Sequence, residues 1–234
     1  MDMILPAFPP AARRVLGALA GFEPRWSLSG RAALWRWLPR VPRPIGQLDL
    51  VWHGRDRLGS LHDEVVSTLA GAGLDVATLH GDAKRIWLGA AYGESACLLS
   101  LTAEPGRALA PPQETRLAGV AVTVDALREV AASTLCFLHK KPNLQDLENA
   151  GLLVLNGVAL DQGLKDACAR HPDLVPVDLA LRLALFDVEG PDLSGIALRR
   201  RRRLQERVVF EILAWAAEAT IPARPSSPSP RAVH

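Results

Sequence analysis

Two short segments near the N-terminus carry residues that could bind a nucleotide. Ser29 and Gly30 form a turn that leads into a helix, and backbone N–H groups at the start of a helix bind phosphate well. Gln47 and Asp49 follow on a strand, where residues two apart project from the same face. Two carboxylates at this spacing would hold Mg²⁺ on a nucleoside triphosphate, and one carboxylate with one amide would hold it less well. The alternative is that Ser29 is an ordinary N-cap and Asp49 a solvent-facing strand residue.

Arginines accompany both segments. Arg31 lies in the first turn of the expected helix, where its charge opposes the helix dipole at a cost of about 0.3–1 kcal/mol. A phosphate or an acidic side chain nearby would remove that cost. Together with Arg36, Arg40 and Arg43, Arg31 therefore indicates an anionic ligand, and charge pairing inside the protein is the alternative.

A second group of arginines lies near the C-terminus. The run consists of five consecutive residues, Arg199, Arg200, Arg201, Arg202 and Arg203. Five consecutive positions go more than once round a helix, so the run has to be exposed. Nucleic acid, including RNA, would suit it through phosphate contacts, and a solvated surface that contacts acidic residues is the alternative.

Composition narrows the class of protein. The chain has 234 residues, of which 49% are hydrophobic and 22% charged, which excludes a disulfide miniprotein and a disordered chain. Its three cysteines are widely separated and form no CxxC pair, so neither a disulfide framework nor a zinc site is indicated. Every apolar run is interrupted well short of a membrane span, and the first residues lack the pattern of a signal peptide. We therefore expect a cytoplasmic protein outside the membrane.

Hydrophobic periodicity divides the chain near residue 124. The first part predicts helices and strands in alternation. A short extended piece is expected at 25–29, and longer strands at 45–52, 75–80, 85–91, 95–102 and 119–124. From Asp125, which is expected to be an N-cap, the apolar period becomes helical and stays so to about residue 220. The predicted fold class is an α/β domain over 1–124 and a helical domain over 125–220. A disordered tail, rich in Pro, Ser and Arg, is expected over 221–234.

In their order and spacing these segments resemble the AbiEii-type toxins, nucleotidyltransferases of abortive-infection and type IV toxin–antitoxin systems. The family's Leu-x-Gly-Gly/Ser-x-Ala-Leu turn is matched by Leu28, Gly30, Ala33 and Leu34. Its second motif, Arg-x-x-x-Asp-x-Asp-Leu, is matched by Arg43, Asp49 and Leu50, and its Asp-x-x-Asp-Leu helix start by Asp146 and Leu147. The resemblance covers residues 12–172.

This chain departs from the family at several site positions. Arg31 replaces a small residue of the phosphate turn, Gln47 the first metal-binding aspartate, and Thr134 the active-site lysine. Asn143 replaces the first acid of the helix start, and Ser100 stands at the expected position of a further strand acid. Thr134 can also be a core residue on the apolar face of its helix, and Asn143 with Asp146 can form a capping box.

The resemblance implies a nucleotidyltransferase fold, in which an α/β domain with a mixed sheet is followed by a C-terminal helical bundle. It also implies transfer of a nucleotidyl group from a nucleoside triphosphate to an RNA or protein acceptor. It implies Mg²⁺ at Asp49, helped by Gln47, with Thr134 and Asp146 at the other catalytic positions. The triphosphate would lie against Ser29, Gly30, Arg31 and Arg43, and a cognate antitoxin-like protein is an implied partner. Since the carboxylate set is incomplete, transfer is expected to be impaired. The alternative is a non-catalytic relative that binds a nucleotide, RNA or protein.

Overall fold

A seven-stranded mixed sheet forms the first half of the molecule. The computed structural model describes residues 8–38, 41, 45–189 and 195–220. The strands in this part of the chain are β1 (Ser27–Ser29), β2 (Gln47–His53), β3 (Asp75–Gly81), β4 (Arg85–Tyr92), β5 (Ser95–Glu104), β6 (Gln113–Leu117) and β7 (Val120–Val124). They are ordered β3-β4-β5-β2-β1-β7-β6, with the β2–β5 and β1–β7 pairs parallel and the others antiparallel.

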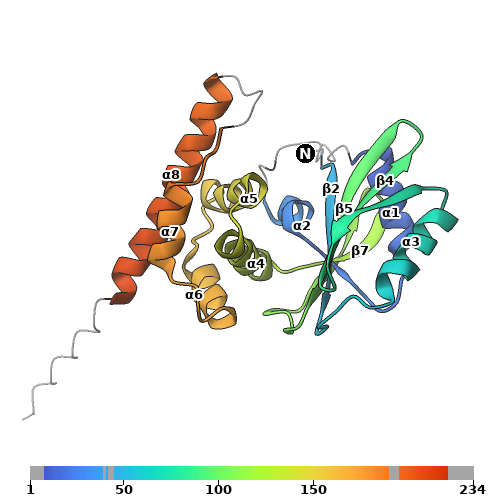
Figure 1. Ribbon diagram of the computed structural model, residues 1–234, viewed down its shortest axis with the longest axis horizontal. Helices are drawn as coiled ribbons and strands as arrows, with labels where there is room; N and C mark the ends of the chain where they lie inside the picture. The colour runs from blue at the N-terminus through green and yellow to red at the C-terminus, as the bar shows by residue number, and fades with distance from the viewer. Residues whose placement is uncertain (1–7, 39–40, 42–44, 190–194, 221–234) are drawn as a thin grey trace, which may run out of the picture.

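Helices cover both faces of the sheet. They are α1 (Pro10–Leu19), α2 (Gly30–Trp37), α3 (Leu61–Gly71), α4 (Leu127–Lys140), α5 (Leu144–Leu155), α6 (Asp161–Arg170), α7 (Pro176–Ala184) and α8 (Gly195–Thr220). Figure 1 shows α1 and α3 on one side of the sheet, α2 and α4 on the other, and α5 to α8 stacked beyond them. The change from strands to helices follows Val124, as predicted, and the division into two domains there stays a prediction.

The predicted strands are confirmed, and one strand was missed. β6 is an edge strand of five residues, QETRL, in which only Leu117 is buried. An edge strand that faces solvent on both sides has no alternation of apolar and polar residues, so its sequence carries no strand signal. Its pairing with β7 gives it its conformation.

Close packing joins α8 to the rest of the helical half. Gly151 of α5 lies so close to Leu204 of α8 that a Cβ on the glycine would overlap the leucine side chain. Beside this contact, Arg201 Nε lies 3.3 Å from Glu148 Oε1. The other four arginines of the run are exposed, as expected, and Arg202 pairs with Glu189.

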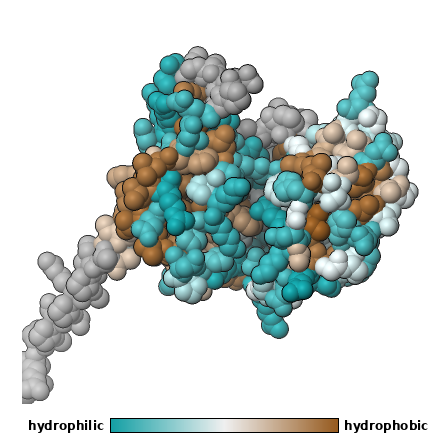
Figure 2. Space-filling model, viewed as in Figure 1, coloured by the Kyte–Doolittle hydropathy of each residue, from teal (hydrophilic) through white to brown (hydrophobic). Residues whose placement is uncertain are grey.

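The outer surface of the helical half is more apolar than its surroundings. Figure 2 shows hydrophobic residues gathered over α7 and α8. The large apolar side chains exposed on these helices are Val177, Leu181, Phe210 and Leu213. In the described part of the chain, no helix combines the length and hydrophobicity needed to cross a membrane.

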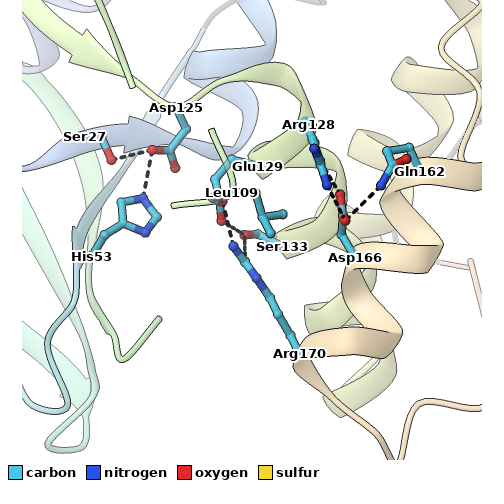
Figure 3. Close-up of polar contacts among 10 residues, drawn as sticks. All are labelled: Ser27, His53, Leu109, Asp125, Arg128, Glu129, Ser133, Gln162, Asp166 and Arg170. Carbon is cyan, nitrogen blue, oxygen red and sulfur yellow. Dashed lines mark hydrogen bonds and ion pairs between the residues drawn. The ribbon is translucent and has the colours of Figure 1, made fainter. Parts of the chain in front are cut away.

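Asp125 does not cap α4, which corrects the sequence prediction. The N-cap position belongs to Ala126, and the Asp125 carboxylate instead accepts hydrogen bonds from the Ser27 hydroxyl and from His53 Nε2, the latter at 2.9 Å (Figure 3). Burial lowers the pKa of His53, but the hydrogen bond to Asp125 and the charges of Asp125 and Glu129 together outweigh burial, so the net pKa is raised. No hydrogen bond joins His53 to Ser27, so these three residues do not form a serine-hydrolase triad.

Candidate functional site

Asp49 lies in the middle of the sheet, on the face that α2 and α4 cover. Strand register places it directly beside Ser29 of β1 and Ser100 of β5. Its side chain is buried, with the residue only 8% exposed, and it lines a small cavity of about 30 Å³ between the sheet and the helical half. The solvent-facing alternative for Asp49 is therefore wrong. A cavity of this size admits one or two water-sized groups.

Gly30 allows the Asp49 carboxylate to pack against the start of α2. Its φ of +59° is in the left-handed region that favours glycine, and a Cβ there would overlap Asp49 Oδ2. Ser29 occupies the N-cap position of α2, but its side chain makes no capping hydrogen bond. Both residues line the cavity, so the turn that the sequence singled out does adjoin Asp49.

Gln47 projects from the same face as Asp49, as the strand spacing predicted. Its Nε2 donates a hydrogen bond of 2.7 Å to Asp49 Oδ1. Burial is the main influence on the carboxyl and raises the pKa of Asp49 to about 6, although the Gln47 bond and the charges of Arg85 and Arg31 act in the opposite direction. Asp49 therefore titrates close to neutral pH.

The donors around Asp49 do not fit a resident Mg²⁺ ion. One carboxylate oxygen is engaged by the Gln47 amide and the other lies against Gly30. Ser100, on the neighbouring strand, supplies a hydroxyl where a second carboxylate would be needed. Among the described residues, no group of three or more His, Cys, Asp or Glu side chains could hold a metal ion.

The helical half contributes Thr134 and Asp146 to the same cavity. Thr134 of α4 is buried, as a core residue would be, and it also lines the cavity. Asn143 caps α5 by accepting a 2.9 Å bond from the Asp146 N–H, which confirms the capping alternative. Asp146 nevertheless lines the cavity with Asp49, and burial raises its pKa as well. Asp146 therefore takes part in the cap of α5 and lines the cavity at the same time.

Arg85 is the site residue that sequence reasoning missed. It begins β4, and its Nε donates a 3.0 Å hydrogen bond to Ser100 Oγ, beside Asp49. Its charge favours the ionised form of Asp49. No local motif marks this arginine, because only the pairing of β4 with β5 and of β5 with β2 brings it to the site.

A larger groove adjoins the cavity. It has a volume of about 1020 Å³ and lies between the sheet and the ends of α4, α5 and α6, which is enough for a small-molecule ligand. Its five cationic side chains are Lys84, Arg85, Lys140, Lys141 and Arg170, and its three carboxylates are Asp82, Glu104 and Asp146. The residues that line both spaces are Arg85, Thr102, Glu104, Phe137, Gln145 and Asp146.

Polar contacts around α4 position one wall of the groove (Figure 3). Buried Glu129 accepts bonds of 2.7 Å from Arg170 Nη2 and from the Leu109 N–H, and one of 3.1 Å from the Ser133 hydroxyl. Burial alone would raise the pKa of Glu129, but the hydrogen bonds from Arg170 and Leu109 and the charges of Arg170 and His53 together lower it. Arg170 is thus held in place and its charge is balanced within the protein.

The remaining predicted arginines that the structure describes do not line the cavity. Arg31 Nη2 forms a 2.6 Å ion pair with Glu148 of α5, so an acidic partner offsets its unfavourable position at the start of α2. Arg40, Arg43 and the tail over 221–234 lie outside the described residues. The arginine run on α8 does not line either space. A role for Arg31 in nucleotide binding and for the run in nucleic-acid binding stays a prediction.

Comparison with known proteins identifies the fold. No protein-family model and no curated protein sequence matches the chain. Among solved structures it is similar to MenT4, a nucleotidyltransferase toxin from Mycobacterium tuberculosis H37Rv, with 14% identity and a TM-score of 0.52 over 87% of this chain and 84% of MenT4. The chain has a nucleotidyltransferase fold. This confirms the fold that the sequence resemblance implied.

Two further solved structures align with this nucleotidyltransferase-fold chain. JHP933 from Helicobacter pylori has 15% identity and a TM-score of 0.47, over 88% of this chain and 89% of its own. The antibiotic-resistance factor ANT(2'')-Ia has 17% identity and a TM-score of 0.47, over 69% of this chain and 89% of its own.

Proposed function

We propose that this protein binds a nucleoside triphosphate in the groove and transfers its nucleotidyl group to a hydroxyl of an RNA or protein acceptor. The observation that carries the proposal is the position of Asp49, buried in a small cavity that shares a wall with a nucleotide-sized groove. The nucleotidyltransfer activity of AbiEii-type toxins, which the sequence resembles, is consistent with it. The antitoxin-like partner of that family is part of the same proposal.

The proposed chemistry uses Asp49 as a general base. The acceptor hydroxyl oxygen attacks the α-phosphorus, the bond from that phosphorus to the pyrophosphate oxygen breaks, and the hydroxyl proton passes to the Asp49 carboxylate. A base works best when its pKa is near the working pH, and the pKa of Asp49 is raised to about 6 by burial. The cavity admits a hydroxyl group while the bulk of the nucleotide stays in the groove.

The turn before α2 would hold the α-phosphate near Asp49. The first N–H groups of a helix have no partner within the helix, and they bind phosphate oxygens well. The Ser29 side chain leaves these groups uncapped, and both Ser29 and Gly30 line the cavity. Asp146, on the opposite wall, would face the acceptor.

Label transfer tests this proposal. The full-length protein is incubated with each of the four ribonucleoside triphosphates, radiolabelled at the α-phosphate, and with cellular RNA or protein. We expect label on one class of acceptor, at a rate that falls about tenfold per pH unit below pH 6 as Asp49 becomes protonated. Asp49→Asn should abolish transfer, and Asp56→Asn, which alters an exposed aspartate outside the cavity, should not. Transfer that persists in Asp49→Asn would contradict the proposal.

A second candidate function is nucleotide binding without transfer. Two observations favour it, because Gln47 holds Asp49 Oδ1 and Ser100 stands where a further carboxylate would be needed. Under this alternative the wild-type protein binds a nucleotide saturably but labels no acceptor. Binding and label transfer, measured on the same preparation, therefore separate the two functions.

A further inference from the structure

Three carboxylates surround the place where the nucleotide phosphates would lie. Asp49 lines the cavity, and Glu104 and Asp146 line both the cavity and the groove. A phosphate would be repelled there unless a cation lay among them. In the described part of the chain, Arg85 is the cationic residue that lines both spaces, because the lysines and Arg170 line the groove alone.

The Arg85 guanidinium is held in position on three sides. Its Nε donates to Ser100 Oγ, so it is anchored to the strand next to Asp49. Its central carbon lies 4.8 Å from the centre of the Trp87 ring and 4.5 Å from the centre of the Phe137 ring. Contacts of this kind fix a planar cation before a ligand arrives, which lowers the entropic cost of binding.

The terminal amino groups of Arg85 are available to a ligand. Within the described residues, Nε is the side-chain atom that makes a hydrogen bond, and no carboxylate forms an ion pair with Arg85. By contrast, Arg31 is paired with Glu148 and Arg170 with Glu129. A guanidinium with two free amino groups can bind two phosphate oxygens at once.

We propose that the Arg85 guanidinium binds the nucleotide phosphates directly and takes the place of a metal ion held by the protein. The inference rests on the proposed function, since it concerns the same nucleotide. A bound Mg²⁺ needs carboxylate ligands, whereas a guanidinium donor does not. The inference therefore explains why the strands supply one carboxylate, Asp49, and have Ser100 at the neighbouring position. The ligand class is a polyphosphate, recognised by charge and by paired N–H donors.

Nucleotide binding in the presence and absence of Mg²⁺ tests the inference. The Kd of the full-length protein for each nucleoside triphosphate is measured by calorimetry, first in EDTA and then in Mg²⁺. We expect binding in EDTA, with a Kd that Mg²⁺ changes less than about threefold. Arg85→Gln should raise the Kd about 10- to 100-fold, and Arg85→Lys should raise it less because it keeps the charge without the planar fork. The control Arg116→Gln alters an exposed arginine on β6 and should leave the Kd unchanged.

Competition separates phosphate binding from a structural role of Arg85. Inorganic triphosphate should displace the bound nucleotide from the wild-type protein and from Arg116→Gln, and it should lose this effect in Arg85→Gln. The free nucleoside should compete equally with all three proteins. If neither inorganic triphosphate nor the free nucleoside competed for Arg85→Gln, the arginine would have only a structural role, and the inference would be overturned.

Two other outcomes distinguish this inference from the function on which it rests. Binding that disappears in EDTA, or an Arg85→Gln protein with the wild-type Kd, would overturn the role of Arg85 and leave nucleotide binding intact. A wild-type protein that binds no nucleotide in either condition would overturn the proposed function, and the inference with it.

Discussion

Asp49→Asn is expected to make the protein more stable at neutral pH. Burial raises the pKa of Asp49 from 3.8 to about 6, so the folded protein holds its proton more tightly than the unfolded chain does. Between these two values the folded state binds more protons, and the free energy of unfolding therefore falls as the pH rises. Each pKa unit corresponds to about 1.36 kcal/mol, so the full cost above pH 6 is about 3 kcal/mol.

Asparagine has nearly the same shape as aspartic acid and carries no charge. It can still accept the hydrogen bond from Gln47 Nε2, which now goes to Asp49 Oδ1. The variant should thus escape the ionisation cost and unfold at a higher urea concentration. We expect a gain of up to about 3 kcal/mol at about pH 7.5, which narrows to about zero near pH 4.

Urea denaturation, followed by tryptophan fluorescence at several pH values, measures this difference. Asp56→Asn makes the same chemical change at an exposed position, and it should stay within about 0.5 kcal/mol of the wild-type protein throughout. The ionisation argument would be refuted if Asp49→Asn and wild type differed in free energy of unfolding as much near pH 4 as at pH 7.5. The absence of any difference at neutral pH would refute it as well.

Two glycines allow further tests of the packing. Gly30→Ala should destabilise the protein by about 1–3 kcal/mol and abolish nucleotide binding, since it strains a residue with φ of +59° and overlaps Asp49; calorimetry and urea denaturation would check both effects. Gly151→Ala should cost about 1–3 kcal/mol because its methyl group overlaps Leu204. Adding Leu204→Ala should relieve the overlap, so the double mutant should lose less stability than the sum of the two single mutants. If the two losses simply add, the overlap is not the cause.

A stability gain on removal of a charge is typical of a functional position. Selection for stability alone would replace a buried carboxylate that costs about 3 kcal/mol. The neighbourhood instead accommodates it, with Gly30 leaving room for one oxygen and Gln47 donating to the other. This pattern favours a site that still uses Asp49 over a core that merely tolerates it.

Local features of the site could be predicted from the sequence because they depend on residues close together in the chain. Gln47 and Asp49 share a face because strand residues alternate, and this spacing holds in any sheet. Asn143 caps α5 because its side chain reaches an N–H three residues on. The exposure of most of the arginine run follows from the helical repeat alone.

Only the tertiary structure decided which charges lie beside Asp49. Strand order and register bring Arg85 to Ser100, and no spacing along the chain indicates that approach. The packing of α5 against α2 gives Arg31 a carboxylate partner. Because β1, β2 and β7 lie together in the sheet, Asp125 bonds to Ser27 and His53 and does not cap its helix. Periodicity in a sequence determines the face on which a residue lies, whereas the partner on that face depends on how distant elements pair and pack.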